Sequence, residues 1–278
     1  MQPTFRIGPI RLAFCLLLAA CGTKVETPAP ITITIGGSTS MLPLLRDLAD
    51  AYQAQHPNVH IAIEGYGSQG GVKRLRASSA GSPEDGLDLA ASSWWPLAGI
   101  EASGDLTATM VARDGIALIV HPHNSVPGLT LLQLQRIYAG RTLKWQEVGG
   151  PSDDIVVISR EDGSGTRAAF EALVMGDEPV TLAAVVMPSS AAVVEYVAKH
   201  PTAIGYVSTT YLTDTVRALP IEGQLPTSAA LRSGAYPLTR SLYLVSGKAS
   251  SQAARAFVGF AVSSAGQSIV ARRYLPRR

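Results

Sequence analysis

The sequence predicts an α/β fold, and three observations lead to this prediction. Short runs rich in β-branched residues alternate along the chain with segments of helical periodicity, the pattern of α/β architecture. Several of these strand-like runs pass into turns rich in glycine, serine and threonine that open the next helix. The chain has 278 residues, 46% of them hydrophobic, which is enough for the cores of about two domains.

The first part of the chain gives the clearest alternation. Residues 31–35 alternate apolar and polar side chains and predict a strand. Residues 41–55 place Leu45, Leu48 and Tyr52 on one helical face and predict an amphipathic helix. By the same criteria, the next three segments predict a strand, a short helix and a buried strand: 59–63, 72–80 and 88–92.

The apolar run 115–120 ends at His121-Pro122, where we expect the chain to pass between two lobes. The alternation then continues. Strands are predicted at 155–159 and 203–207, and helices at 131–139, 167–175 and 191–199. The apolar run 241–245 predicts a strand that returns the chain to the first lobe, and 253–271 predicts a closing helical region.

The first twenty residues predict a signal peptide spanning 1–20. Arg6 and Arg11 supply positive charge, and the apolar run 12–20 is too short to span a bilayer. The run ends in Leu18-Ala19-Ala20-Cys21, which resembles a bacterial lipobox. We therefore expect Cys21 to carry palmitate as a lipidated N-terminus, with 21–30 as a tether. An ordinary signal peptide followed by an incidental cysteine is the alternative.

Cysteine usage and net charge narrow the classes of protein that fit this sequence. The only other cysteine, Cys15, lies inside the expected signal peptide, so a mature chain has no intramolecular disulfide partner for Cys21. Removal of 1–20 leaves 21 basic and 21 acidic residues. A formally neutral chain is not expected to bind nucleic acid, and any affinity for anions has to come from local geometry.

Three strand-to-helix junctions are alike in composition. They are residues 36–40 (GGSTS), 65–71 (GYGSQGG) and 160–166 (REDGSGT). The first N–H groups of a helix have no partner inside the helix and carry a partial positive charge, while glycine lets a ligand approach the backbone. Three such helix starts that converge on one point would bind an anion without net charge. Each junction alone is also typical of an ordinary helix N-cap.

Arg160 lies at the end of a predicted strand, beside the third junction. A guanidinium offers a rigid fork of donors that matches a tetrahedral oxyanion. Asp162 follows two residues later, and we expect its carboxylate to orient the fork while keeping the site near neutral. An exposed ion pair between Arg160 and Asp162 is the alternative.

The segments GGSTS, GYGSQGGVKRL and SREDGSGTR resemble those of the periplasmic phosphate-binding proteins of phosphate ABC importers. The resemblance spans residues 31 to about 270 in order and includes 137–140 (IYAG), 203–207 (AIGYV) and 236–238 (YPL). It implies a type II solute-binding fold, in which two lobes joined by a hinge enclose phosphate. The expected lobes are 31–113 plus 239–278, and 114–238. The resemblance also implies an ABC permease as partner and a periplasmic location; the membrane that holds the anchor stays open.

Carried onto this chain, the resemblance gives a set of phosphate-binding residues: Ser38, Thr39, Ser40, Ser68, Ser93, Arg160, Ser164, Gly165 and Thr166. Ser93 departs from the best-known members, which carry an aspartate that accepts a hydrogen bond from the phosphate's own proton. Sulfate brings no such proton, so an aspartate repels it, whereas a serine donates or accepts. We therefore expect phosphate binding with a weaker filter against sulfate.

Other function classes fit the sequence less well. Gly-x-Ser-x-Gly is absent around Ser68 and Ser164, and no histidine falls in the three junctions, so we expect no enzyme activity and no cofactor. The sequence has no P-loop and no metal-ligand spacing. Two binding alternatives stay open: a protein for sulfate, molybdate or tungstate, and a phosphate-sensing lipoprotein without a transport role. We expect a monomer.

Overall fold

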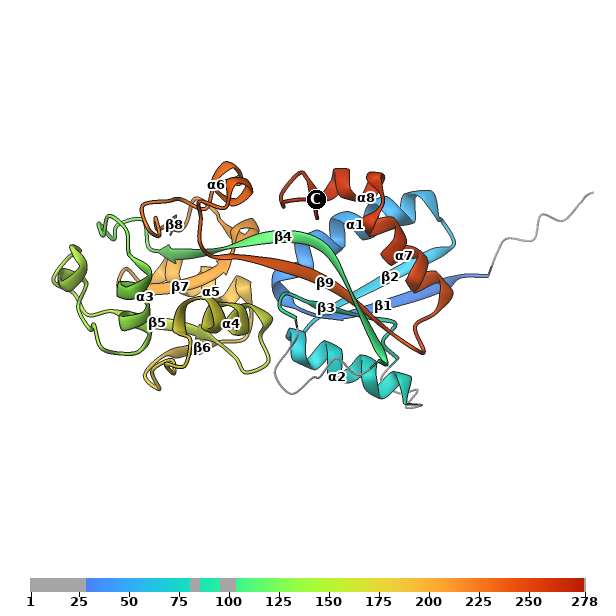
Figure 1. Cartoon of the computed structure of the whole chain (residues 1–278), viewed down its shortest axis with the longest axis horizontal. Helices are drawn as coiled ribbons and strands as arrows, with labels where there is room; N and C mark the ends of the chain where they lie inside the picture. The colour runs from blue at the N-terminus through green and yellow to red at the C-terminus, as the bar shows by residue number, and fades with distance from the viewer. Residues whose placement is uncertain (1–28, 81–85, 96–103, 278) are drawn as a thin grey trace, which may run out of the picture.

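The computed structural model describes residues 29–80, 86–95 and 104–277. The expected signal peptide 1–20 and Cys21 lie outside these residues, as does most of the tether expected at 21–30. Two α/β lobes lie side by side along the long axis, and the strands β4 (Leu106–Val120) and β9 (Thr239–Gly247) run between them (Figure 1). Within the described residues, no helix is both long enough and apolar enough to cross a membrane.

The first lobe begins with β1 (Ile31–Gly37), which leads through the 3-10 turn η1 (Thr39–Met41) into α1 (Leu42–Gln55). Pro43 lies in the first turn of α1, where a backbone N–H has no partner within the helix, so the missing N–H of proline costs no hydrogen bond. The other elements of this lobe are β2 (Val59–Gly65), α2 (Ser68–Ser79), β3 (Leu89–Ser92), α7 (Gln252–Val262) and α8 (Ser264–Val270).

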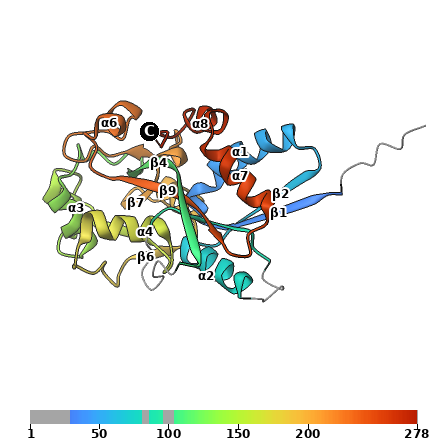
Figure 2. The same ribbon diagram turned by 45° about the vertical axis from the view of Figure 1, so that its right-hand side comes forward.

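The second lobe holds the elements between the two crossing strands. Its first helix, α3 (Leu131–Tyr138), starts with a capping box between Thr130 and Gln133. The others are η3 (Trp145–Val148), β5 (Val156–Arg160), α4 (Gly165–Phe170), the π-helical turn η4 (Glu171–Met175), β6 (Val185–Met187), α5 (Ser190–Lys199), β7 (Ala203–Ser208), η5 (Thr209–Tyr211), β8 (Arg217–Ala218) and α6 (Ser228–Ser233). Figure 2 shows α3, α4 and α6 at one end of the molecule and α1 and α7 at the other.

The strands of the described residues join one nine-stranded sheet in the order β2-β1-β3-β9-β4-β7-β5-β6, with β8 paired to β4. In the first lobe β1 pairs in parallel with β2 and β3, and in the second β5 pairs in parallel with β6 and β7. The crossing strands β4 and β9 are antiparallel to each other. Each lobe therefore presents the carboxyl ends of its parallel strands together, the usual place for a ligand in α/β proteins.

Each lobe has its own hydrophobic core. In the first lobe, Ile33 of β1 and Phe257 of α7 belong to one buried cluster. In the second lobe, Trp145 and Phe170 belong to another. Trp94, just after β3, packs against the large second-lobe cluster and also against a smaller first-lobe cluster. Its half-buried ring is therefore an apolar contact between the lobes.

A fully buried ion pair ties β4 to β9 where they pass between the lobes. Arg240 donates from Nε and Nη2 to Asp114 Oδ2 at 3.2 and 2.9 Å. Asp114 Oδ1 accepts from Ser208 Oγ and Thr209 Oγ1, each at 3.1 Å. These partners compensate the desolvation of the carboxylate. The predicted lobe boundaries, just before Asp114 and just after Leu238, fall beside this pair, and we keep them as a proposal.

The structure extends or divides several predicted elements. The run 115–120 is only the last part of β4, which starts at Leu106, because the preceding residues pair with β9 and are strand as well. The predicted helix 167–175 begins earlier, at Gly165, and becomes π-helical at Glu171. The predicted helical region 253–271 is divided at Ser263, whose side chain caps α8.

Candidate functional site

The first and third strands of the first lobe bring two predicted site segments together. β1 and β3 are parallel neighbours, so the loops that follow them leave the sheet at the same edge. Gly37 has φ +137°, and a Cβ there would lie 2.4 Å from the carbonyl oxygen of Ala91, so this close approach needs glycine. Ser38 N–H donates to the same carbonyl at 2.9 Å. This packing sets Ser38 beside Ser93.

Four serines of the first lobe form a buried hydroxyl cluster. Ser38 Oγ lies 2.9 Å from Ser40 Oγ and donates to Ser93 Oγ at 2.9 Å. Ser93 N–H donates to Ser68 Oγ at 3.2 Å. Gly67, with φ +96°, turns the chain so that Ser68 becomes the first residue of α2, four residues earlier than predicted. The structure thus brings together the predicted site residues of the first two junctions and Ser93.

The third junction approaches this cluster from the second lobe. Ser164 caps α4, and its Oγ accepts the N–H of Arg167 at 3.3 Å. Gly165 lies so close to the first lobe that a Cβ on it would be 2.3 Å from Ser68 Oγ and 2.6 Å from Ser93 Oγ. Thr166 is buried next to it. The three junctions therefore converge on one buried point between the lobes.

Arg160, the last residue of β5, is 1% exposed. Its Nη2 donates to Thr39 Oγ1 of the first lobe at 3.1 Å, and its Nη1 donates to Ser190 Oγ at 3.3 Å. Glu161 holds the guanidinium side-on: Oε2 accepts from Nε and Oε1 accepts from Nη2, both at 2.8 Å. This pair brings a cation to the convergence point and leaves the surroundings near neutral.

The expectation that Asp162 orients Arg160 is wrong. Asp162 forms an ion pair with Arg167, which also donates to Glu171 at 2.7 Å and to the carbonyl of Arg160 at 3.1 Å. The Asp162 side chain is 94% exposed. The alternative of an exposed ion pair between Arg160 and Asp162 is therefore wrong as well, because Arg160 is buried and bonds Glu161.

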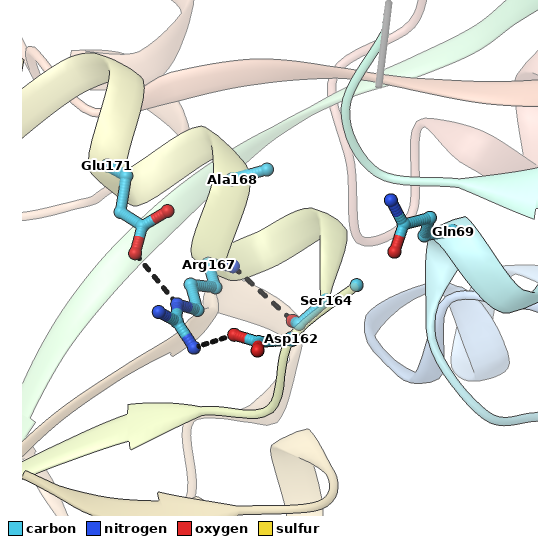
Figure 3. A pocket seen from close by; sticks show the side chains of 7 residues that line it. Gln69, Asp162, Ser164, Arg167, Ala168 and Glu171 are labelled. Carbon is cyan, nitrogen blue, oxygen red and sulfur yellow. Dashed lines mark hydrogen bonds and ion pairs between the residues drawn. The ribbon is translucent and has the colours of Figure 1, made fainter. Parts of the chain in front are cut away.

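A pocket of about 140 Å³ lies beside the convergence point (Figure 3). Gln69 of α2 forms one side of it, and the other side is formed by Ser164, the N-cap of α4, by Ala168 of α4 and by Glu171 of η4. Gln69 N–H donates to the carbonyl of Gly163 at 3.0 Å, a backbone hydrogen bond between the lobes. The pocket therefore opens along the line where the lobes meet.

Tyr206 of β7 supports the end of β5. Its hydroxyl oxygen accepts the N–H of Arg160 at 3.2 Å and lies 2.9 Å from Ser159 Oγ. Burial raises the pKa of Tyr206 to about 12, so the phenol stays neutral. Its ring stacks on that of Phe170, with centroids 4.3 Å apart. These contacts fix the backbone from which Arg160 projects.

Sequence reasoning missed three residues of this site: Glu161, Ser190 and Tyr211. Ser190 begins α5, and its N–H donates to Thr39 Oγ1 at 3.4 Å. Tyr211 Oη donates to the carbonyl of Thr39 at 2.6 Å. A signal for Ser190 was present, because residues 185–191 (VVMPSSA) form a fourth strand–serine–helix junction. For Glu161 and Tyr211 the sequence holds no comparable local pattern.

The donor set suits a small oxyanion. Hydroxyls and helix-start N–H groups supply neutral donors, and one guanidinium supplies charge. Within the described ranges, no group of three or more His, Cys, Asp or Glu side chains could hold a metal ion. The chemistry that the described donors offer at this point is recognition of an anion by hydrogen bonds and one guanidinium charge.

Comparisons with known sequences agree with this arrangement. A family model described as a PBP superfamily domain matches residues 23–265. The chain is 33% identical over 241 residues to the phosphate-binding protein PstS of Bacillus subtilis, covering 81% of this chain and 77% of that relative. It is 25% identical over 250 residues to the phosphate-binding protein PstS of Borreliella burgdorferi, covering 86% and 87%.

Solved structures show the same likeness. A phosphate ABC transporter substrate-binding protein from Clostridium perfringens, with bound phosphate, matches with a TM-score of 0.81 and 34% identity over 89% of this chain and 99% of that one. An ABC-type phosphate transport receptor from Vibrio cholerae matches with a TM-score of 0.70 and 31% identity over 87% and 99%. The two-lobe fold and the expectation of a binding protein rather than an enzyme are confirmed. The chain belongs to the PBP superfamily and, within it, to the PstS-like family of phosphate-binding proteins.

Proposed function

We propose that this protein captures inorganic phosphate between its two lobes and delivers it to an ABC importer. The convergence of three helix starts on the buried guanidinium of Arg160 carries the proposal. The names of the Bacillus subtilis relative and of the phosphate-bound Clostridium perfringens structure support the same ligand. The proposed phosphate contacts are Ser38, Thr39, Ser40, Ser68, Ser93, Arg160, Ser164, Gly165 and Thr166.

Capture follows from the division of donors between the lobes. The first lobe supplies the serine cluster and Thr39, and the second supplies Arg160 and the start of α4. An oxyanion that accepts from both sets holds the lobes together. A hydrogen bond to a charged group contributes about 1.5–3 kcal/mol, so several are needed to offset the desolvation of phosphate. The closed form is favoured by its higher affinity for the anion, and the permease recognises that form.

Calorimetric titration of the purified protein, freed of bound anion, with phosphate and then with sulfate, molybdate and tungstate tests the proposal. We expect micromolar or tighter binding of phosphate. Binding of sulfate, molybdate or tungstate but not of phosphate would show that another oxyanion is the ligand. Binding of none of these anions would refute anion capture altogether.

The residue at position 93 is expected to set the discrimination against sulfate. Ser93 Oγ is buried in the hydroxyl cluster and brings no charge to it. A carboxylate there would repel deprotonated sulfate, whereas it would accept a hydrogen bond from the proton of hydrogen phosphate. The ratio of the sulfate Kd to the phosphate Kd, measured by calorimetry at pH 8, should rise about tenfold or more in Ser93→Asp. Ser93→Asn, of similar size without charge, is the control. An equal ratio in wild type and Ser93→Asp would refute this account of selectivity.

We also propose that the protein is a periplasmic lipoprotein anchored through Cys21 and acts as a monomer, because one chain carries donors from both lobes. Labelling cells with a palmitate analogue should mark the wild type and not Cys21→Ser. Cys15→Ser should keep the label, because Cys15 lies in the expected signal peptide. Equal labelling of wild type and Cys21→Ser would rule out lipidation at Cys21.

A further inference from the structure

Tyr211 is not among the proposed phosphate contacts, but it joins the lobes at one of them, Thr39. Its ring packs against a second-lobe cluster that includes Val193 and Val207, and its hydroxyl donates to the carbonyl of Thr39 in the first lobe at 2.6 Å. We propose that Tyr211 is a positioning residue that couples closure of the lobes to the alignment of the Ser40 amide for the anion. The inference rests on the proposed function, because it concerns how that site holds its ligand.

The peptide bond between Thr39 and Ser40 links closure of the lobes to the alignment of the Ser40 amide. In a planar trans peptide, the C=O of one residue and the N–H of the next point in opposite directions. The Thr39 carbonyl accepts from Tyr211 Oη as well as from the N–H of Leu42 at the end of η1, so the N–H of Ser40 is held facing away from both. Fixing this peptide plane sets the direction of the backbone N–H of Ser40, one of the proposed phosphate contacts.

Thr39 receives donors from the second lobe on both its side chain and its carbonyl. Arg160 and the N–H of Ser190 donate to its hydroxyl at 3.1 and 3.4 Å, while Tyr211 donates to its carbonyl. Partial burial raises the pKa of Tyr211, against the opposite influence of Arg46 and Arg160, so the hydroxyl remains a neutral donor. These contacts exist only while the lobes are together.

Tyr211→Phe removes the hydroxyl alone and tests the coupling in stopped-flow measurements of phosphate binding. The hydrogen bond forms as the lobes close around a captured anion. We therefore expect the dissociation rate constant to rise about three- to tenfold, with an unchanged association rate constant. If Tyr211 only stabilised the fold, Tyr211→Phe would instead lower the fraction of the protein that binds phosphate and leave the dissociation rate constant unchanged. Tyr196→Phe is the matched control, because Tyr196 lies on α5 of the same lobe with its ring stacked on His200.

A ligand-free measurement separates this proposal from the proposed function. Gln69 N–H donates across the lobes to the carbonyl of Gly163, so its hydrogen exchange reports closure without any anion. We expect this amide to exchange faster in Tyr211→Phe than in the wild type or Tyr196→Phe. If the Gln69 amide exchanges faster in Tyr211→Phe but the wild type binds no phosphate, the proposed ligand is refuted and the role of Tyr211 in closure still holds. Equal exchange rates, or an unchanged dissociation rate constant for phosphate, would overturn the role of Tyr211.

Discussion

Arg160→Ala is expected to weaken phosphate binding by about 30- to 1,000-fold. Arg160 is the buried cation at the convergence point, and its Nη2 already reaches Thr39 of the opposite lobe. Its loss removes charge-assisted hydrogen bonds and leaves the carboxylate of Glu161 uncompensated beside the anion. Calorimetric titration with phosphate measures the change.

Arg167→Ala is the matched control for this result, because it removes the same charge from the same motif. Arg167 pairs with Asp162 and Glu171, and we expect its loss to change phosphate affinity at most about fivefold. Thermal unfolding should show that both variants fold, since the side chain of Glu161 is already 27% exposed and can turn to solvent. Wild-type affinity in Arg160→Ala would remove this arginine from the site.

Gly165→Ala is expected to weaken phosphate binding about 100-fold or more. Its backbone does not need glycine, because no left-handed φ occurs there. The constraint comes from the opposite lobe: the new methyl carbon would lie 2.3 Å from Ser68 Oγ and 2.6 Å from Ser93 Oγ. Either the lobes stay apart or both hydroxyls turn away from the anion, and each response removes donors.

The same variant should leave the unliganded fold intact, because opening of the lobes relieves the clash. Gly259→Ala is the control, since Gly259 also lies in a helix and a Cβ added to it would meet no atom outside its own helix backbone within 4 Å. Calorimetric titration should give wild-type affinity for Gly259→Ala, and thermal unfolding without phosphate should give similar midpoints for all three proteins. Tight phosphate binding by Gly165→Ala would show that the lobes do not meet at this glycine.

The three junctions could be predicted because their signals are local. A β-rich run, a glycine that permits a tight turn and a hydroxyl residue at a helix start lie within a few positions of one another. Ser164 as the cap of α4 and a glycine with positive φ at the end of β1 follow directly from that pattern. The residues that converge were therefore largely foreseeable, although their ligand contacts stay predictions.

The parts of the site and of the fold that are not predicted from the sequence depend on contacts that no local sequence pattern indicates. Glu161 and Asp162 are adjacent acids, and only the folded loop shows that Glu161 meets Arg160 while Asp162 meets Arg167. Tyr211 reaches Thr39 from the other lobe. The first part of β4 is not predicted as strand, and in the structure it pairs with β9. Long-range packing of this kind overrides local propensity.

The strand order has a consequence for how the chain is made. β9 lies between β3 and β4 in the sheet, although it is the last strand to be synthesised. A nascent chain that has emerged as far as Leu238 already holds β3 and β4 but lacks the strand that joins them. Unpaired strand edges invite pairing with other chains, so this interval exposes the newborn polypeptide to aggregation. The lobe that starts first along the chain is therefore the one that is completed last.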